Sequence, residues 1–531
     1  MPVSRRELAC VAAILALASI LRFVNLPGRG GWGSDQGDQM LDVWRVLQTG
    51  HLPQVGPLSS IGTFHHGALT YDLWLLPSWL GHGDPTWVVG QTALLGVATV
   101  AIVWWVARGI GGSTAGLIAA YVAAISTALI GYSIYVWNPT LLEPGAALAL
   151  LGTWQAWRTR NPRWWLVAAI GLDVVAQAHI AGPFLAIPFA GVYVLALRRS
   201  AGARGQVRRH LLWGLAAVAF VAVTYLPYLI YEVNGNFAET RAVLSYLTSP
   251  SDEARLAPPL AILLSYTRFI SWPTTGWPLV QLSSGFPVAL LVAAGMSAAF
   301  AWQFAALRRE RRAARAAEPP SAPGLPPLED RWQGFLLVVG SLLVVVVAGG
   351  LGLKDLSHVQ RLPTEQYHAW ADPLALVAVG LALGALWRLA GPTGAPRLPQ
   401  ALVGAALVLL TLWNAANWPP LDAGDGGYPA ARNAVTRLEA DLNGSTVSLV
   451  SLFPPEDTNA YVYPLTLDGV TPVAPGRAQV LVLYCDAFFT NGCEGAAQSA
   501  WLAVNELPPT VTLIDRIPAG PDRTLSVYRL P

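Results

Sequence analysis

Long apolar stretches alternate with polar segments along most of the chain. A helix that crosses about 30 Å of hydrocarbon needs about 20 mainly apolar residues, and eleven segments approach this requirement. They are 8–24, 87–106, 114–134, 140–157, 164–178, 182–197, 211–231, 286–307, 334–353, 373–389 and 401–418. The pattern predicts an all-α, polytopic membrane domain over residues 1–418. The fifth and sixth segments are short and also fit a re-entrant hairpin, which would leave the later orientation unchanged.

The composition agrees with a membrane protein. Of the 531 residues, 54% are hydrophobic and only 12% are charged, against roughly a quarter in a soluble domain. The net charge is +2 and the arginines are scattered. Because nucleic-acid binding needs a clustered basic surface, we expect no nucleic-acid partner.

The arginines predict the orientation of the segments. Arg5 and Arg6 precede the first segment, and further arginines fill every second loop up to Arg397. Short cytoplasmic loops carry an excess of Lys and Arg. We therefore expect a multi-pass plasma-membrane protein with a cytoplasmic amino terminus and everything after Trp418 outside the cytoplasm. A cleavable signal peptide over residues 1–24 is the alternative, and it would not alter the later orientation.

The hydrophobic pattern changes after residue 418. Residues 430–442 have the period of an amphipathic helix, and four short β-rich runs follow at 447–453, 480–484, 511–514 and 525–528. This pattern predicts a small extracytoplasmic α/β domain over residues 419–531. Cys485 and Cys493 lie within it, in an oxidising compartment, so we expect them to form a disulfide.

Ionisable residues are rare inside the apolar segments. Asp173 is the exception, and we interpret it as hydrogen-bonded to a neighbouring helix. The others gather at the predicted outer ends: Arg22, Glu143, His179, Glu232 and Asp372. A transporter of polar solutes would place such groups near the mid-plane, so this distribution favours chemistry at the outer membrane surface.

The first outer loop, residues 25–86, carries the most informative pattern. Three acids, Asp35, Asp38 and Asp42, accompany apolar positions at helical spacing in residues 34–50. Acids near a helix start interact favourably with the helix dipole. The pattern predicts an interfacial helix, and on its own it fits a structural helix as well as a catalytic one.

With its neighbours, this loop resembles the GT-C membrane glycosyltransferases, in particular the protein-mannosyltransferase and aminoarabinose-transferase-like branch. Asp35 matches the family's Asp, Gly50 the Gly that ends its interfacial helix, and Pro53 the following Pro. Leu69 and Tyr71 match a later Leu-x-Tyr element. The chain departs from the family pattern at Gln36, Gln39 and 66–68.

Three later junctions resemble the same family. Glu143 follows an Asn-Pro at the outer start of the fourth segment, and His179 lies in a polar break between the fifth and sixth. His368 and Asp372 precede Pro373 at the start of a late segment.

The resemblance implies transfer of a sugar from a polyprenyl-phosphate donor to a hydroxyl of a protein, lipid or glycan acceptor, on the outer face and with inversion. Asp35 is then the expected base, preferred over Asp38 by its register in the motif. We expect no cofactor, although the resemblance leaves room for a divalent metal, and we expect contacts with membrane lipids. A transporter or flippase of lipid-linked saccharides is the alternative, and a noncatalytic scaffold a third hypothesis.

Arginine suits recognition of the departing phosphate, because its planar fork gives paired charge-assisted bonds. Arg268 and Arg361 are the preferred candidates among the outer cations. At the histidines beside the predicted cleft, hydrogen bonding is favoured over metal ligation. The expected substrate-binding residues are Asp38, His65, His66, Tyr71, Glu143, His179, Arg268, Arg361 and His368.

Overall fold

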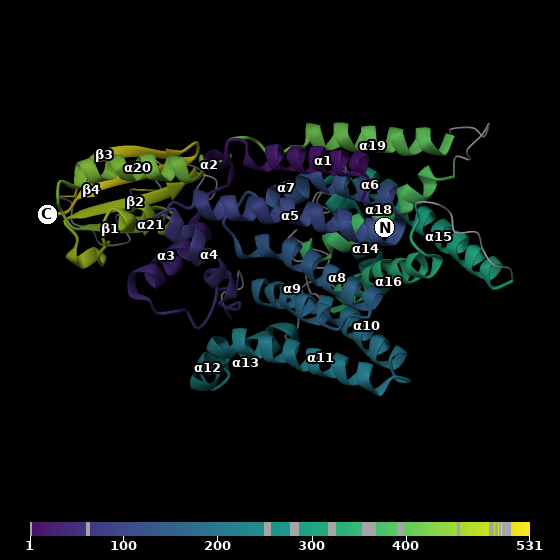
Figure 1. Cartoon of the computed structure of the whole chain (residues 1–531). Helices are drawn as coiled ribbons and strands as arrows, with labels where there is room; N and C mark the ends of the chain where they lie inside the picture. Colours follow the sequence, from purple (N-terminus) through teal and green to yellow (C-terminus); the bar gives the residue numbers. More distant parts are fainter. Residues whose placement is uncertain are drawn as a thin grey trace.

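The computed structural model describes residues 3–59, 64–248, 256–276, 286–316, 325–352, 368–389, 398–453, 457–487, 493, 498, 501 and 511–531. Within these ranges the chain forms a large bundle of helices with a small sheet at one end (Figure 1). The predicted fold class, a helical membrane domain followed by an α/β domain, is confirmed.

Helices of different lengths make up the membrane domain. Four come before the segment predicted at 87–106: α1 (Arg5–Phe23), α2 (Leu26–Arg29), α3 (Ser34–Thr49) and α4 (Leu69–Leu80). The others are α5 (Thr86–Gly111), α6 (Ser113–Ile125), α7 (Thr127–Tyr132), α8 (Leu142–Thr159), α9 (Trp164–Ala178), α10 (Ala186–Arg199), α11 (Arg204–Thr224), α12 (Leu226–Asn234), α13 (Ala238–Thr248), α14 (Pro258–Thr275), α15 (Phe286–Ala316), α16 (Leu328–Gly352), α18 (Asp372–Trp387) and α19 (Leu398–Ala416).

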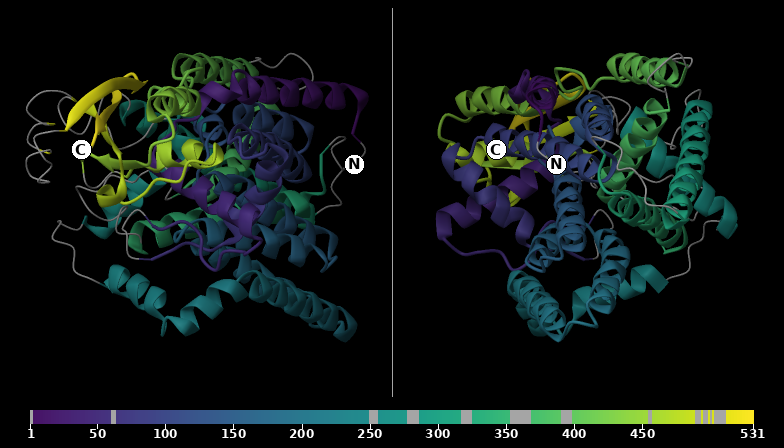
Figure 2. Two further views of the ribbon diagram at one scale, coloured as in Figure 1. Left: turned by 90° about the vertical axis from the view of Figure 1, so that its left-hand side faces the viewer. Right: turned by 45° about the vertical axis from the view of Figure 1, so that its right-hand side comes forward.

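Among the described helices, six are long and apolar enough to cross a membrane. They are Thr86–Gly111, Arg204–Thr224, Pro287–Arg315, Leu328–Leu351, Ala369–Trp387 and Leu398–Ala416. Helices α11 and α19 lie at opposite edges of the bundle (Figures 1 and 2) and expose large apolar side chains, such as Leu215 and Leu409. Apolar surface of this extent is what a lipid environment requires, and the chain is a membrane protein.

The structure corrects two predicted segments and one expected loop. Segment 114–134 is two helices, because Ser126 ends α6 and its Oγ accepts from Leu129 N (3.2 Å) at the start of α7. Segment 211–231 is also broken, at Tyr225, with Pro227 in the first turn of α12. Residues 232–285, expected as an outer loop, contain α13 and α14. Helix α14 packs into the core, and its two initial prolines, Arg268 and Pro273 hide it from an apolar pattern.

Helix α18 forms the centre of the bundle. It is buried from Asp372 to Gly384 and packs against α5, α6, α14 and α16. Small residues permit the closest approach, since a Cβ at Gly380 would lie 2.4 Å from Ala119 Cβ. Small residues at helix contacts are typical of membrane bundles.

The chain after residue 418 forms a second domain, which we call the tail domain. It has a four-stranded sheet in the order β1-β2-β4-β3. Its strands are β1 (Val447–Ser451), β2 (Val480–Asp486), β3 (Thr512–Gly520) and β4 (Arg523–Arg529), and only the β1–β2 pairing is parallel. Helix α20 (Gly427–Leu442), expected at 430–442, and α21 (Asn459–Leu467) complete it.

The tail domain shares a hydrophobic core with α3 and α4. Trp32, Met40 and Val43 pack in one cluster with residues of α20, α21 and the sheet. A Cβ at Gly37 would lie only 2.1 Å from Asn459 O, so α3 and α21 meet backbone to backbone. The start of α3 is therefore built jointly by both ends of the chain.

Candidate active site

A cavity of about 540 Å³ opens beside the first turn of α3. It lies between this turn, α7 with the segment that follows it, and the end of α14. Its lining consists of Gly33, Ser34, Asp35, Gln36, Thr127, Ala128, Gly131, Tyr132, Tyr135, Trp137 and Trp272. We call this space the Asp35 cavity.

Local sequence places Asp35 at the cavity. Gln36 Oε1 accepts from Gly33 N (2.9 Å), which satisfies an N–H group at the helix start. At the other end, Gly50 adopts a left-handed conformation (φ 72°) that terminates α3. The predicted helix and its terminal glycine are confirmed.

The three acids of α3 have different surroundings. Asp38 Oδ1 accepts from Asn459 Nδ2 (3.2 Å), and Asp42 Oδ2 accepts from Tyr71 OH (3.1 Å). Asp35 instead lines the cavity and is exposed to it. Of the three, Asp35 is therefore placed to meet a ligand, while Tyr71 orients Asp42.

The surroundings of Asp35 and Asp38 favour the protonated carboxyl more than water does. Partial burial, and then the nearby Asp457, raise the pKa of Asp35 above its ordinary value. Burial, followed by repulsion from Asp42, Asp457 and Asp35, raises the pKa of Asp38 to about 6. A carboxylate with a raised pKa is a better proton acceptor near neutral pH.

Aromatic side chains form much of the cavity wall. Tyr132, Tyr135, Trp137 and Trp272 all contribute. Burial, then Asp425 and Asp35, raise the pKa of Tyr135 to about 12, so its hydroxyl stays protonated. The wall thus offers flat apolar faces with polar tips, a surface that can hold a sugar ring.

Behind Trp272 lies a sealed group of charged residues. The guanidinium of Arg268 is 5.7 Å from the Trp272 ring, and its Nε donates to His368 Nε2. Asp372 faces both Arg268 and Glu143, and Glu143 faces Arg22. We call Arg22, Glu143, Arg268, His368 and Asp372 the inner charge cluster; each is at most 2% exposed.

The predicted histidines do not line the Asp35 cavity: His368 belongs to the inner charge cluster, and His179 lies near it. His66 stacks on His179 with centroids 5.4 Å apart. Burial, then His65, lower the pKa of His66 to about 4, so this ring is neutral at pH 7. His65 Nδ1 lies 3.0 Å from Glu239 Oε1 of α13.

The remaining predictions have mixed outcomes. Asp173 accepts from Thr224 of the neighbouring helix α11 (2.8 Å), as the sequence predicted. Cys485 and Cys493 form a disulfide. Arg361 lies outside the described residues. Within the described part of the chain, no group of three His, Cys, Asp or Glu residues could hold a metal ion.

Sequence reasoning missed most of the cavity wall. Tyr132 lies at the end of the predicted segment 114–134, and Tyr135 and Trp137 lie in the junction that follows it. Trp272 was indistinguishable from an interfacial belt residue. Arg22 and Asp372 were noticed at outer ends, but not their membership of one cluster. The run of aromatics from 132 to 137 is the one local signal that could have indicated a wall.

No known family model matches the chain, and no curated protein matches it. Its structure resembles ArnT from Cupriavidus metallidurans, with a TM-score of 0.59 over 98% of both chains at 12% identity. The chain has the fold of the GT-C glycosyltransferases. ArnT bound to undecaprenyl phosphate matches equally well, over 97% of both chains (TM-score 0.59, 12% identity). Arabinofuranosyltransferase AftD from Mycobacteria has a TM-score of 0.51 at 15% identity, and the chain spans 42% of its length.

Proposed function

We propose that the protein is a membrane glycosyltransferase that moves a sugar from a polyprenyl-phosphate donor to a hydroxyl acceptor on the outer face of the membrane, with inversion. The observation that supports this most directly is that Asp35 opens into an aromatic-lined cavity, in a chain with the GT-C fold. The neighbour with bound undecaprenyl phosphate supports the lipid phosphate donor.

Asp35 acts as the general base. The acceptor oxygen attacks the anomeric carbon from the face opposite the phosphate, and the Asp35 carboxylate takes the hydroxyl proton. The bond between the anomeric carbon and the phosphate oxygen breaks, and the polyprenyl phosphate departs with the electron pair. The configuration at the anomeric carbon is inverted.

Arg268 is the proposed partner of the departing phosphate. It lies one helical turn before Trp272 in α14, and Trp272 both lines the cavity and contacts the guanidinium. Because Arg268 is fully buried beside Trp272, the proposal includes a movement that opens Arg268 to the cavity. Positive charge at this point stabilises the leaving group.

The orientation is part of the proposal. Helix α1 begins far from the tail domain, at the other end of the bundle (Figure 1). A cytoplasmic amino terminus, as the arginines predict, then puts the cavity and the tail domain on the outer side. The acceptor is a protein, lipid or glycan that reaches this surface.

The test uses purified protein with a set of polyprenyl-phosphate sugars and hydroxyl acceptors. Asp35→Asn should abolish transfer, because it removes the base while keeping the side-chain shape, and Asp38→Asn should retain measurable transfer. Asp515→Asn is the matched control, since Asp515 pairs with Arg437 on the tail surface. Full activity in Asp35→Asn would overturn the assignment of the base. Movement of the lipid-linked sugar between leaflets without transfer would favour a flippase.

A further inference from the structure

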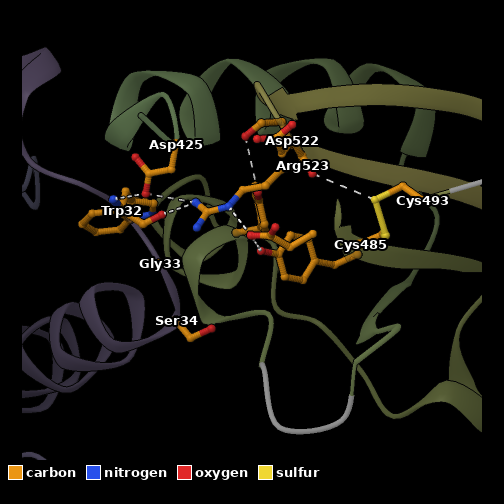
Figure 3. Close-up of polar contacts among 12 residues, drawn as sticks. Trp32, Gly33, Ser34, Asp425, Cys485, Cys493, Asp522 and Arg523 are labelled. Atoms are coloured by element: carbon orange, nitrogen blue, oxygen red, sulfur yellow. Dashed lines mark hydrogen bonds and ion pairs between the residues drawn. A yellow bond between two sulfur atoms is a disulfide. The ribbon is translucent and has the colours of Figure 1, made fainter. Parts of the chain in front are cut away.

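Arg523 of the tail domain reaches into the segment that precedes Asp35. Its Nη1 donates to Trp32 O (2.6 Å) and lies 3.2 Å from Asp425 Oδ2, while its Nε donates to Asp486 Oδ2 (2.9 Å). Figure 3 shows the guanidinium between Trp32 and Asp425 on one side and the end of the sheet on the other. The side chain is only 15% exposed.

Trp32 is held at both its backbone groups. Its N donates to Asp425 Oδ2 (2.8 Å), the same oxygen that Arg523 approaches, and its O accepts from Arg523. The indole Nε1 donates to Ala460 O (2.7 Å). Since Trp32 is 2% exposed, this residue is anchored in the tail domain by three hydrogen bonds.

Because Trp32 lies just before α3, its hydrogen bonds also hold the start of this helix. Gly33 and Ser34 follow Trp32, and both line the Asp35 cavity together with Asp35 itself. Ser34 Oγ donates to Asp457 O (2.9 Å), a second contact with the tail domain. A shift of the Trp32 backbone therefore moves the first turn of α3 relative to the cavity wall formed by α7 and α14.

We infer that Arg523 is a positioning residue for the transfer reaction: by holding Trp32 O, it fixes the first turn of α3 so that the Asp35 carboxylate faces the acceptor. This inference rests on the proposed function. An arginine suits the task because its rigid fork holds a carbonyl and two carboxylates at once, which a lysine cannot do. The tail domain is then part of the active-site architecture.

The disulfide supports both ends of this arrangement. Cys485 directly precedes Asp486, and Cys493 Sγ lies 4.0 Å from Asp522 O, next to Arg523 (Figure 3). Ala487 N also donates to Asp522 O (2.8 Å). These contacts hold Asp486 and the chain beside Arg523 in place independently of Trp32.

The experiment compares Arg523→Lys and Arg523→Met with wild type in the transfer assay. Arg523→Lys keeps the charge but loses the fork, and we expect kcat to fall about tenfold to a hundredfold, since small misplacement of a reacting group has effects of this size. Arg523→Met should lose more. The matched control is Arg437→Gln, which removes an exposed arginine of the same domain and should leave kcat unchanged.

Two readouts separate positioning from general destabilisation. Hydrogen exchange of residues 30–36 should accelerate in folded Arg523→Lys, while exchange in α18 stays at the wild-type rate. The acid limb of the pH profile should also move to lower pH, because a loosened turn hydrates Asp35. The groups that act on Asp35 or lie beside it are Asp38 in α3, Tyr135 in the wall, and Asp457 and Arg523 in the tail domain.

The outcomes are distinguishable. Unchanged kcat, exchange and acid limb in Arg523→Lys would overturn the positioning role while leaving the transferase proposal intact. If wild type transfers no sugar at all, the proposed function fails, and the exchange data still report whether Arg523 holds the segment. If Arg523→Met does not fold, Arg523→Lys decides, because it retains a cation for Asp486.

Discussion

Two groups of ionisable side chains lie close together, and they differ in what they face. The inner charge cluster combines two arginines with two carboxyls, and every member is sealed from water. At the Asp35 cavity, burial and the neighbouring carboxyls raise the pKa of Asp35 and Asp38, and Asp35 itself is open to the cavity. Buried charges persist only when paired, whereas an unfavourable arrangement of like charges at an open cavity is typical of a functional site.

Because the two groups face different surroundings, mutations in them should have different effects on stability and on reaction rate. Changes at Arg22, Glu143 and Asp372 of the inner cluster should reduce the free energy of unfolding, because they leave a charge uncompensated in the bundle. Changes at Arg268 should reduce both stability and rate, since it is also the proposed partner of the phosphate. Changes at the cavity should reduce the reaction rate and leave stability almost unaltered. The following experiments test this division.

Arg22→Met should have the largest effect on stability. Arg22 is fully buried, donates to Ala124 O (3.2 Å) and faces Glu143. Removing the guanidinium leaves buried carbonyl oxygens without a donor and takes away the favourable charge near Glu143. Each unsatisfied buried group costs about 1–3 kcal/mol, which thermal unfolding in detergent would detect as a large fall in Tm. The double variant Arg22→Met with Glu143→Leu should recover part of the loss. A wild-type Tm in Arg22→Met would break the comparison.

Asn414→Ala tests how α19 holds α7 and α14, the two helices that line the Asp35 cavity opposite α3. Asn414 Oδ1 accepts from Thr127 N (2.9 Å), and its Nδ2 donates to Thr274 O (2.8 Å), so it joins α7, α14 and α19. The residue is 2% exposed. Leaving these groups unsatisfied should cost about 2 kcal/mol. The neighbouring Asn417→Ala is the control, since Asn417 is exposed and bonds within its own helix.

The sequence predicted those parts of the site that local patterns determine. The acids, the apolar positions at helical spacing and Gly50 were enough to define α3, whereas the choice of Asp35 among its acids came from the resemblance to the GT-C family. The tail strands were also found close to their observed positions, because β-rich runs between turns are a local signal. The disulfide was expected from compartment and proximity.

The sequence could not predict which distant elements meet. Trp272 and Arg268 lie in a stretch interpreted as a loop, because prolines and a charge interrupt its apolar pattern, and yet tertiary packing buries it as α14. Likewise, Trp32 and Arg523 are nearly five hundred residues apart, and no local period indicates that one holds the other. Periodicity reports that a face is buried, but not what buries it.

The pH profile of kcat/KM examines the cavity side of the comparison. Asp35 must be ionised to act as a base, and its pKa is raised above the ordinary value of about 3.9. Activity should therefore fall as the pH decreases, with the acid limb at higher pH than an ordinary aspartate gives. Asp457→Asn removes a repelling carboxylate and should shift this limb to lower pH. An acid limb near pH 4 in wild type would contradict the electrostatic argument.

Asp35→Asn should have the smallest effect on stability, although it has the largest effect on the rate. Because the pKa of Asp35 is higher in the folded state than in the unfolded chain, ionising this carboxyl at pH 7 lowers the free energy of unfolding. The neutral amide removes the repulsion from Asp457, so Tm should stay the same or rise slightly, within about 0.5 kcal/mol. The measurement is thermal unfolding of Asp35→Asn and Arg22→Met under the same conditions, and their Tm values are compared. A fall in Tm as large as that of Arg22→Met would mean that Asp35 supports the fold as the inner cluster does, and that its exposure to the cavity is not the property that matters.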